Sequence, residues 1–171
     1  MRHFGISIND HQPENGIEAA KSGLIDSFQV IFNIFDQSPI DKLFPFCLEN
    51  GIAIIARVPF DEGTLTGTLT KESSWPEGDW RNTYFVPENL RTSVEHAEQL
   101  KPLVPPAMTM PEMALRFILN NPVISTIIPG MRRLHHVESN LAASDAGPLP
   151  EELHMALRGH RWDRTPTNWS Q

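Results

Sequence analysis

The chain has 171 residues and a formal net charge of −7, with 20% charged and 40% hydrophobic residues, values typical of one globular domain with a sizeable core. The acidic balance argues against nucleic acid or an anionic membrane as the main partner, since both favour a basic surface. Cys47 is the only cysteine, the N-terminus lacks a signal-peptide core, and no run approaches the ~18 apolar residues of a membrane span, so we expect a soluble protein of the cytoplasm.

The first fifty residues alternate between strand-like and helix-like segments. Residues 3–8 are expected to form a strand and residues 13–22 a short helix. Residues 27–32 are rich in β-branched and aromatic side chains, as strands are. Residues 40–50 suit a second helix, provided that Pro45 falls in its first turn. The apolar sides of the two helices are expected to include Ile17, Ala20, Leu24, Leu43, Phe44, Cys47 and Leu48.

Residues 51–67, GIAIIARVPFDEGTLTG, predict a buried strand that runs straight into a loop. The continuous apolar run of residues 52–56 is typical of a strand that is covered on both faces. Arg57 ends this run, and Gly63 and Gly67 bracket a loop where a ligand could approach the main chain. Ligand sites of α/β proteins collect at the carboxyl ends of strands, so we expect a site here.

A long segment without periodicity, residues 68–86, follows this loop. Loops of this length inside compact domains tend to be binding loops or lids, and its tryptophans indicate an ordered structure. The remaining expected elements are helices at residues 87–100 and 111–120, a strand at 123–128, and helices at 134–143 and 151–158.

Strands that alternate with helices imply parallel strands joined by right-handed crossovers. Four such units form either an open doubly wound sheet or part of a barrel. A complete eight-stranded barrel typically needs ~250 residues, so this chain cannot hold a whole one. Periodicity alone leaves both architectures open.

Short sequences at the four strand ends resemble the aldo/keto reductase family in their order and spacing. They are Gly5-Ile6-Ser7, Gln29, residues 54–67, and Ile128-Pro129-Gly130 with Asn140 ten residues on. Bacterial members of the family carry a similar ARVPF sequence. The resemblance implies a (β/α)8 TIM barrel, of which residues 1–171 would be the C-terminal half, with strands five to eight and the tail.

The resemblance also implies positions that bind the nicotinamide and pyrophosphate of a cofactor. Ser7 and Gln29 match the groups that hydrogen-bond the nicotinamide carboxamide, and Asn9 is a third candidate. Arg57 falls where many relatives carry a tyrosine that stacks on the nicotinamide. The loop around the pyrophosphate, with backbone N–H donors, would consist of Pro59, Phe60, Gly63, Leu65 and Gly67.

A second group of residues at the last strand end matches the family's adenosine contacts. Gly130, Arg132 and Arg133 precede a helix N-terminus, which attracts anions. Arg132 matches a contact with the 2′-phosphate, Asn140 matches an adenine contact, and His136 stands where relatives have Gln or Arg. An arginine pair without an acidic partner favours NADP over NAD. Taken without the resemblance, the arginines could equally be a solvated helix start, and the two loop glycines plain turn residues.

The catalytic residues of the family are expected to be missing from this chain. The family reduces carbonyls with an Asp, a Tyr, a Lys and a His from the first half of its barrel, and none of those motifs is present. Tyr84 is the only tyrosine and lies at the wrong place for the acid. A metal site at His135 and His136 is not expected, since adjacent helical residues point apart.

The sequence therefore predicts a fragment or truncated form of an NADP-dependent aldo/keto reductase. Its partners would be NADPH and a small carbonyl substrate in a full-length form. The alternative is a non-catalytic half-barrel that binds a nucleotide or a partner chain. In either case, open strand edges favour self-association.

Overall fold

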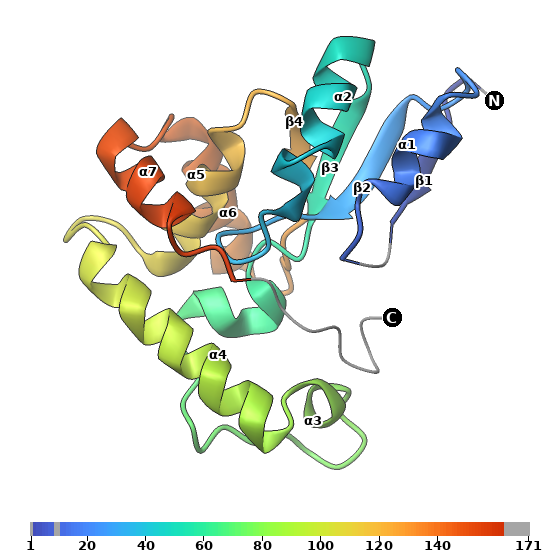
Figure 1. The fold of residues 1–171 in the computed structure, drawn as a ribbon. Coiled ribbons are helices and arrows are strands. Elements are labelled where there is room, and N and C mark those ends of the chain that lie inside the picture. The colour runs from blue at the N-terminus through green and yellow to red at the C-terminus, as the bar shows by residue number, and fades with distance from the viewer. Residues whose placement is uncertain (1, 9–10, 163–171) are drawn as a thin grey trace.

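The computed structural model describes residues 2–8 and 11–162. Its centre is a sheet of four parallel strands in the order β1-β2-β3-β4 (Figure 1). The strands are β1 (Gly5–Ser7), β2 (Ser27–Ile31), β3 (Ala53–Arg57) and β4 (Ile124–Ile127). All four were expected from the sequence, and their parallel pairing was too. β3 extends through Arg57, one residue beyond the apolar run of residues 52–56.

Helices connect and flank these strands. The α-helices are α1 (Asn15–Ala20), α2 (Leu43–Asn50), α3 (Arg81–Tyr84), α4 (Pro87–Leu100), α5 (Met110–Leu119), α6 (Leu134–Asp145) and α7 (Glu151–Arg158), and the 3-10 helices are η1 (Ser38–Ile40), η2 (Asp61–Thr66) and η3 (Lys101–Leu103). The helix expected at residues 40–50 is split, because η1 ends at Ile40 and α2 begins only at Leu43. Pro45 therefore falls in the first turn of α2, where its missing N–H breaks no helical bond.

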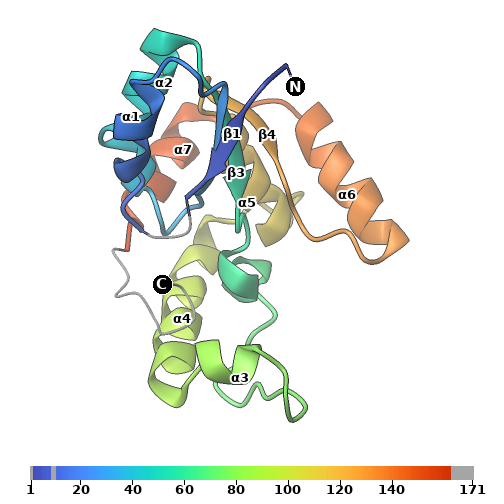
Figure 2. The ribbon, with the colours of Figure 1, turned by 90° about the vertical axis from the view of Figure 1, so that its right-hand side faces the viewer.

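The two faces of the sheet differ in burial. Phe28 and Val30 of β2, and Ile54 and Ala56 of β3, are at most 1% exposed. Figures 1 and 2 show α1, α2 and α7 together on one side of the sheet. The opposite face remains half-buried along β3. The expectation that β3 is covered on both faces is wrong for the described structure, because its burial alternates along the strand.

The core contains most of the apolar residues that the periodicity selected. Cys47 is fully buried in it, as expected, and burial raises the pKa of its thiol to about 11. Leu24 and Leu48 are exceptions, with 65% and 62% of their surface exposed. Leu24 lies beyond the last residue of α1, and Leu48 faces away from the core side of α2.

The long segment after β3 is ordered, as its tryptophans indicate. It contains the short helix α3, which the sequence did not predict, and it leads into α4. Tyr84, Phe85, Leu90 and Val94 form a separate small core there, and the rings of Trp75 and Phe85 stack at 5.2 Å. Figure 2 shows α3 and α4 beyond the end of the sheet toward which the strands run. The helices of the described part are all too short or too polar to cross a membrane.

Candidate functional site

The carboxyl end of β1 and the middle of β2 bring a hydroxyl and an amide together. Parallel pairing places Ser7 opposite Gln29, and the Nε2 of Gln29 donates a hydrogen bond to the Ser7 Oγ at 3.1 Å. Ser7 is exposed and Gln29 is half-buried, so both can be reached from the open face of the sheet. Together they can both donate and accept hydrogen bonds, as recognition of a carboxamide requires.

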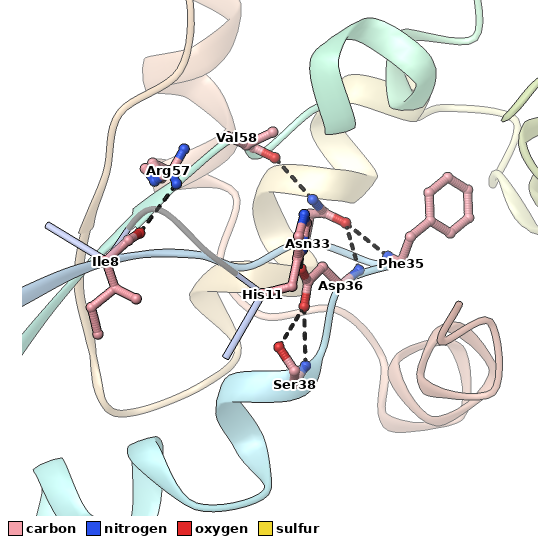
Figure 3. A network of polar contacts seen from close by, with 8 residues as sticks. All are labelled: Ile8, His11, Asn33, Phe35, Asp36, Ser38, Arg57 and Val58. Carbon is pink, nitrogen blue, oxygen red and sulfur yellow. Dashed lines mark hydrogen bonds and ion pairs between the residues drawn. The ribbon is translucent and has the colours of Figure 1, made fainter. Parts of the chain in front are cut away.

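Arg57 extends this polar group along the same face. Ile55 pairs with Gln29 and Arg57 lies two residues further, so their side chains leave the same side of the sheet. Its Nη2 donates to the carbonyl of Ile8 at 3.1 Å (Figure 3). Its Nε is buried without a hydrogen-bond partner in the described structure. Burial lowers the pKa of Arg57, while the charges of Glu62 and Asp36 act in the opposite direction.

The turn that follows β3 is conformationally strained. Val58, Asp61 and Glu62 have φ angles of 55°, 48° and 56°, in the left-handed region that non-glycine residues rarely adopt. Such residues persist only when neighbours hold them, and they cluster at binding and catalytic sites. A side chain from the neighbouring strand end supplies part of that hold, since the Nδ2 of Asn33 donates to the Val58 carbonyl at 3.0 Å.

Asn33 is the centre of a buried polar network that the sequence analysis missed. It is fully buried, and its Oδ1 accepts hydrogen bonds from the backbone N–H groups of Phe35 and Asp36, both at 2.9 Å (Figure 3). The short spacing of Asn33 and Asp36 is typical of a side chain that closes a turn, and this was the only local signal. The local sequence does not indicate the hydrogen bond from Asn33 to Val58, which is 25 residues away.

Asp36 connects this network to a pocket beside it. Its Oδ2 lies 2.6 Å from the Nδ1 of His11, and its Oδ1 accepts from the Ser38 hydroxyl at 2.7 Å (Figure 3). The pocket has a volume of about 280 Å³ and is lined by His11, Glu14, Asp36, Ser38, Asp41, Lys42 and Arg161. Its acids are paired within the pocket: Arg161 forms a two-bond ion pair with Asp41, and Lys42 lies 3.7 Å from Glu14.

The loop expected to wrap a pyrophosphate forms the tight helix η2. Gly63 and Gly67 have φ angles of 111° and 70°, so both positions require glycine-like freedom. Their backbone N–H groups donate to the carbonyls of Phe60 and Thr64, and the N–H of Leu65 also donates to Phe60. In the described structure the turn itself therefore uses these three N–H groups. Pro59 and the side chain of Leu65 are buried, and Phe60 packs against the core.

The start of α6 gathers the second set of expected residues. Arg133 occupies the N-cap position, and no side chain caps the helix. Gly130 and Arg132 are exposed beside it, and the Nδ2 of Asn140 donates to the Gly130 carbonyl at 3.4 Å. Desolvation lowers the pKa of His136, and the charges of His135, Arg133 and Arg132 act in the same direction. This cationic helix start can receive an anion.

The remaining candidates contribute nothing to the two groups of residues above. Tyr84 is buried in the small core of α3 and α4. Trp162 packs on the core, with its ring stacked on His96 at 4.0 Å. The rings of His135 and His136 are in contact at 4.2 Å, contrary to the expectation that they point apart. In the described ranges, however, no three metal-ligating side chains converge. Asn9 lies outside the described residues.

Comparisons with known proteins give a consistent result. The sequence profile of the aldo/keto reductase family matches residues 1–161. The chain is 32% identical over 148 residues to an NADH-specific methylglyoxal reductase of Escherichia coli. The aligned region covers 82% of this chain and 45% of that protein. It is 29% identical over 162 residues to the uncharacterized oxidoreductase YqkF of Bacillus subtilis, covering 94% of this chain and 50% of the relative.

A solved structure agrees in fold. The holo form of the aldo-keto reductase AKR11C1 from Bacillus halodurans superposes with a TM-score of 0.70 at 23% identity, over 99% of this chain and 54% of that chain. The chain thus spans about half the length of the curated relatives it matches.

Proposed function

Because the chain belongs to the aldo/keto reductase family, as the match over residues 1–161 shows, we propose that it is the cofactor-binding half of an NADP-dependent reductase of carbonyl compounds. The observation that carries this proposal is the contact between Ser7 and Gln29 at the carboxyl edge of the sheet. A hydroxyl and an amide that touch on an open sheet face suit the carboxamide of a nicotinamide.

The half-barrel assignment is supported by coverage and by the sheet. The matched relatives and the solved structure are each about twice as long as the matched region. The sheet is entirely parallel, and β1 and β4 each have one paired side among the described residues. We therefore assign residues 1–171 to strands five to eight of the barrel and the tail.

The proposed choice of NADP rests on the start of α6. Arg132 and Arg133 place two permanent charges at a helix start that no side chain caps, and phosphate is the anion that such a site favours. The name of the Escherichia coli relative specifies NADH for that protein. The proposal of NADP for this chain therefore rests on the arginines.

Each residue of the site has a defined task in this proposal. A bound reduced nicotinamide supplies the hydride. Ser7 and Gln29 hold the carboxamide and so fix which face of the ring points away from the sheet, while Arg57 lies beside them. Asn140 holds the backbone of Gly130 and shapes the adenosine end. The group that protonates the carbonyl oxygen would come from the other half of the barrel.

Exposed apolar residues just after β4 and on α6 favour a second candidate, association with another chain. Ile128, Leu134 and Leu141 are 48%, 73% and 58% exposed, and exposed apolar surface of this kind can mark an association site. Such a surface would be covered either by the first half of the barrel or by a second copy. The lone, buried cysteine is compatible with the cytoplasm as the compartment.

Calorimetric titration with NADPH tests the proposed function. We expect saturable binding of one cofactor per chain. Gln29→Leu should weaken this binding, because it removes the side-chain donor and acceptor that would bond the nicotinamide carboxamide. Gln99→Leu, on the exposed side of α4, is the matched control and should bind like the wild type. Absence of NADPH binding to the folded wild-type chain would contradict the proposal.

A further inference from the structure

Arg57 carries a permanent charge that the surrounding structure satisfies only in part. One Nη donates to the Ile8 carbonyl, whereas the buried Nε has no partner in the described structure. A buried charged donor without an acceptor costs free energy, so it is kept where a ligand or function compensates. The strained turn at Val58 directly follows it, which also marks this strand end as a binding position.

Two carboxylates among the described residues act on the charge of Arg57. Asp36 and Glu62 are the carboxylates that act on the guanidinium. Asp36 is already engaged by His11 and Ser38 and lies in the buried network rather than on the open face. Arg57 therefore brings a positive charge to the open face beside Ser7 and Gln29.

Building on the proposed function, we propose that Arg57 makes the site bind the reduced nicotinamide in preference to the oxidised one. The reduced ring is uncharged, whereas the oxidised ring carries one positive charge; all other groups of the two forms are the same. Contacts with the phosphates and adenosine therefore contribute equally, and the repulsion from Arg57 acts only on the oxidised form. Product release after hydride transfer would be favoured for the same reason.

The size of this preference follows from the position of Arg57. The guanidinium is half-buried, so its field is screened less than that of a surface arginine. Two like unit charges about 6 Å apart, at an effective dielectric constant of about 40, repel by an amount that corresponds to about a tenfold difference in affinity. For a two-electron couple, a tenfold preference for the reduced form raises the potential of the bound cofactor by about 30 mV.

Fluorescence or calorimetric titrations with NADPH and NADP⁺ measure the preference directly. We expect the wild-type chain to bind NADPH about tenfold more tightly. Arg57→Met should bring the ratio of the two dissociation constants close to one, and Arg57→Lys, which keeps the charge, should preserve it. Arg91→Met, on the exposed side of α4, is the control variant and should also leave the ratio unchanged.

Adenosine 2′,5′-bisphosphate, which lacks the nicotinamide, distinguishes a missing cofactor site from a missing effect of Arg57. It should bind wild type and Arg57→Met equally. If neither this ligand nor either cofactor binds, the proposed function fails and the inference falls with it. If the ligands bind but the wild type shows equal affinity for NADPH and NADP⁺, or if a folded Arg57→Met keeps the wild-type ratio, the inference alone is overturned. If Arg57→Met does not fold, the wild-type ratio of the two dissociation constants is measured at low and high salt. A preference for NADPH that declines at high salt supports the inference, and equal affinities overturn it.

Discussion

The side-chain amide of Asn33 donates a hydrogen bond to the carbonyl of Val58 at 3.0 Å and so ties the end of β2 to the left-handed residue after β3. Asn33→Ala removes this bond and leaves the N–H groups of Phe35 and Asp36 without their buried acceptor. We expect a loss of about 2–4 kcal/mol in the free energy of unfolding, because unpaired buried groups cost about 1–3 kcal/mol each. Urea denaturation measures it.

Asn50→Ala is the matched control for Asn33→Ala. Asn50 is exposed at the end of α2, where its amide bonds only the carbonyl of Phe46. Its replacement should change the free energy of unfolding by no more than about 0.5 kcal/mol. Equal denaturation midpoints for the two variants would show that the Asn33 network does not hold the strained turn.

Cys47 should make stability fall at alkaline pH. Burial raises the pKa of its thiol from 9.0 to about 11. Between these values the unfolded chain has lost the proton and the folded chain retains it, so the free energy of unfolding decreases as pH rises from about 9 to about 11. In Cys47→Ala this part of the pH dependence should be absent. The same burial should make the native thiol unreactive toward a thiol reagent until the chain unfolds; rapid labelling of the native chain at pH 8 would contradict its core position.

Arg132→Glu should separate the two nicotinamide cofactors. A charge-assisted bond to phosphate contributes about 1.5–3 kcal/mol, so we expect NADPH affinity to fall by about tenfold or more while NADH affinity changes little. Arg91→Glu, which reverses an exposed charge on α4, controls for the general change in net charge. Titrations that show equal loss for both cofactors would remove the 2′-phosphate from the proposed site.

Isolated chains should associate through the open end of the sheet. Unpaired strand edges and the exposed apolar side chains of Ile128, Leu134 and Leu141 favour closed dimers or larger aggregates. Leu134→Lys should shift light scattering toward the monomer, whereas Met155→Lys, at an exposed position of α7, should not. A wild-type monomer with a cooperative melting transition would refute this expectation.

Local patterns predicted most of the fold because each element had its own signal. The apolar run before Arg57 predicted β3, and the prolines and glycines marked its loop. The pairing of Ser7 with Gln29 was also accessible, since parallel strands place their carboxyl ends at one edge. The resemblance supplied the order of the strand ends, which periodicity could not.

Long-range polar contacts were not accessible in the same way. Asn33 and Val58, or His11 and Asp36, are each 25 residues apart, and nothing in their local sequence specifies the partner. The hydrogen bonds within the loop after β3 were not accessible for a related reason. The sequence shows that Gly63 permits an unusual turn, but not that the turn uses its own N–H groups.

Cofactor oxidation with a panel of aldehydes, followed by the absorbance of NADPH, tests the central claim most directly. Hydride transfer leaves negative charge on the carbonyl oxygen, and the general acid that neutralises it contributes about 10²–10⁴ in rate. The only phenol, Tyr84, is buried between α3 and α4. We predict no turnover by the chain alone and turnover after addition of a separately produced first half of a related barrel, with Gln29→Leu reducing it. Robust turnover by the chain alone that disappears in Tyr84→Phe would contradict the claim that it is a cofactor-binding half without its own acid.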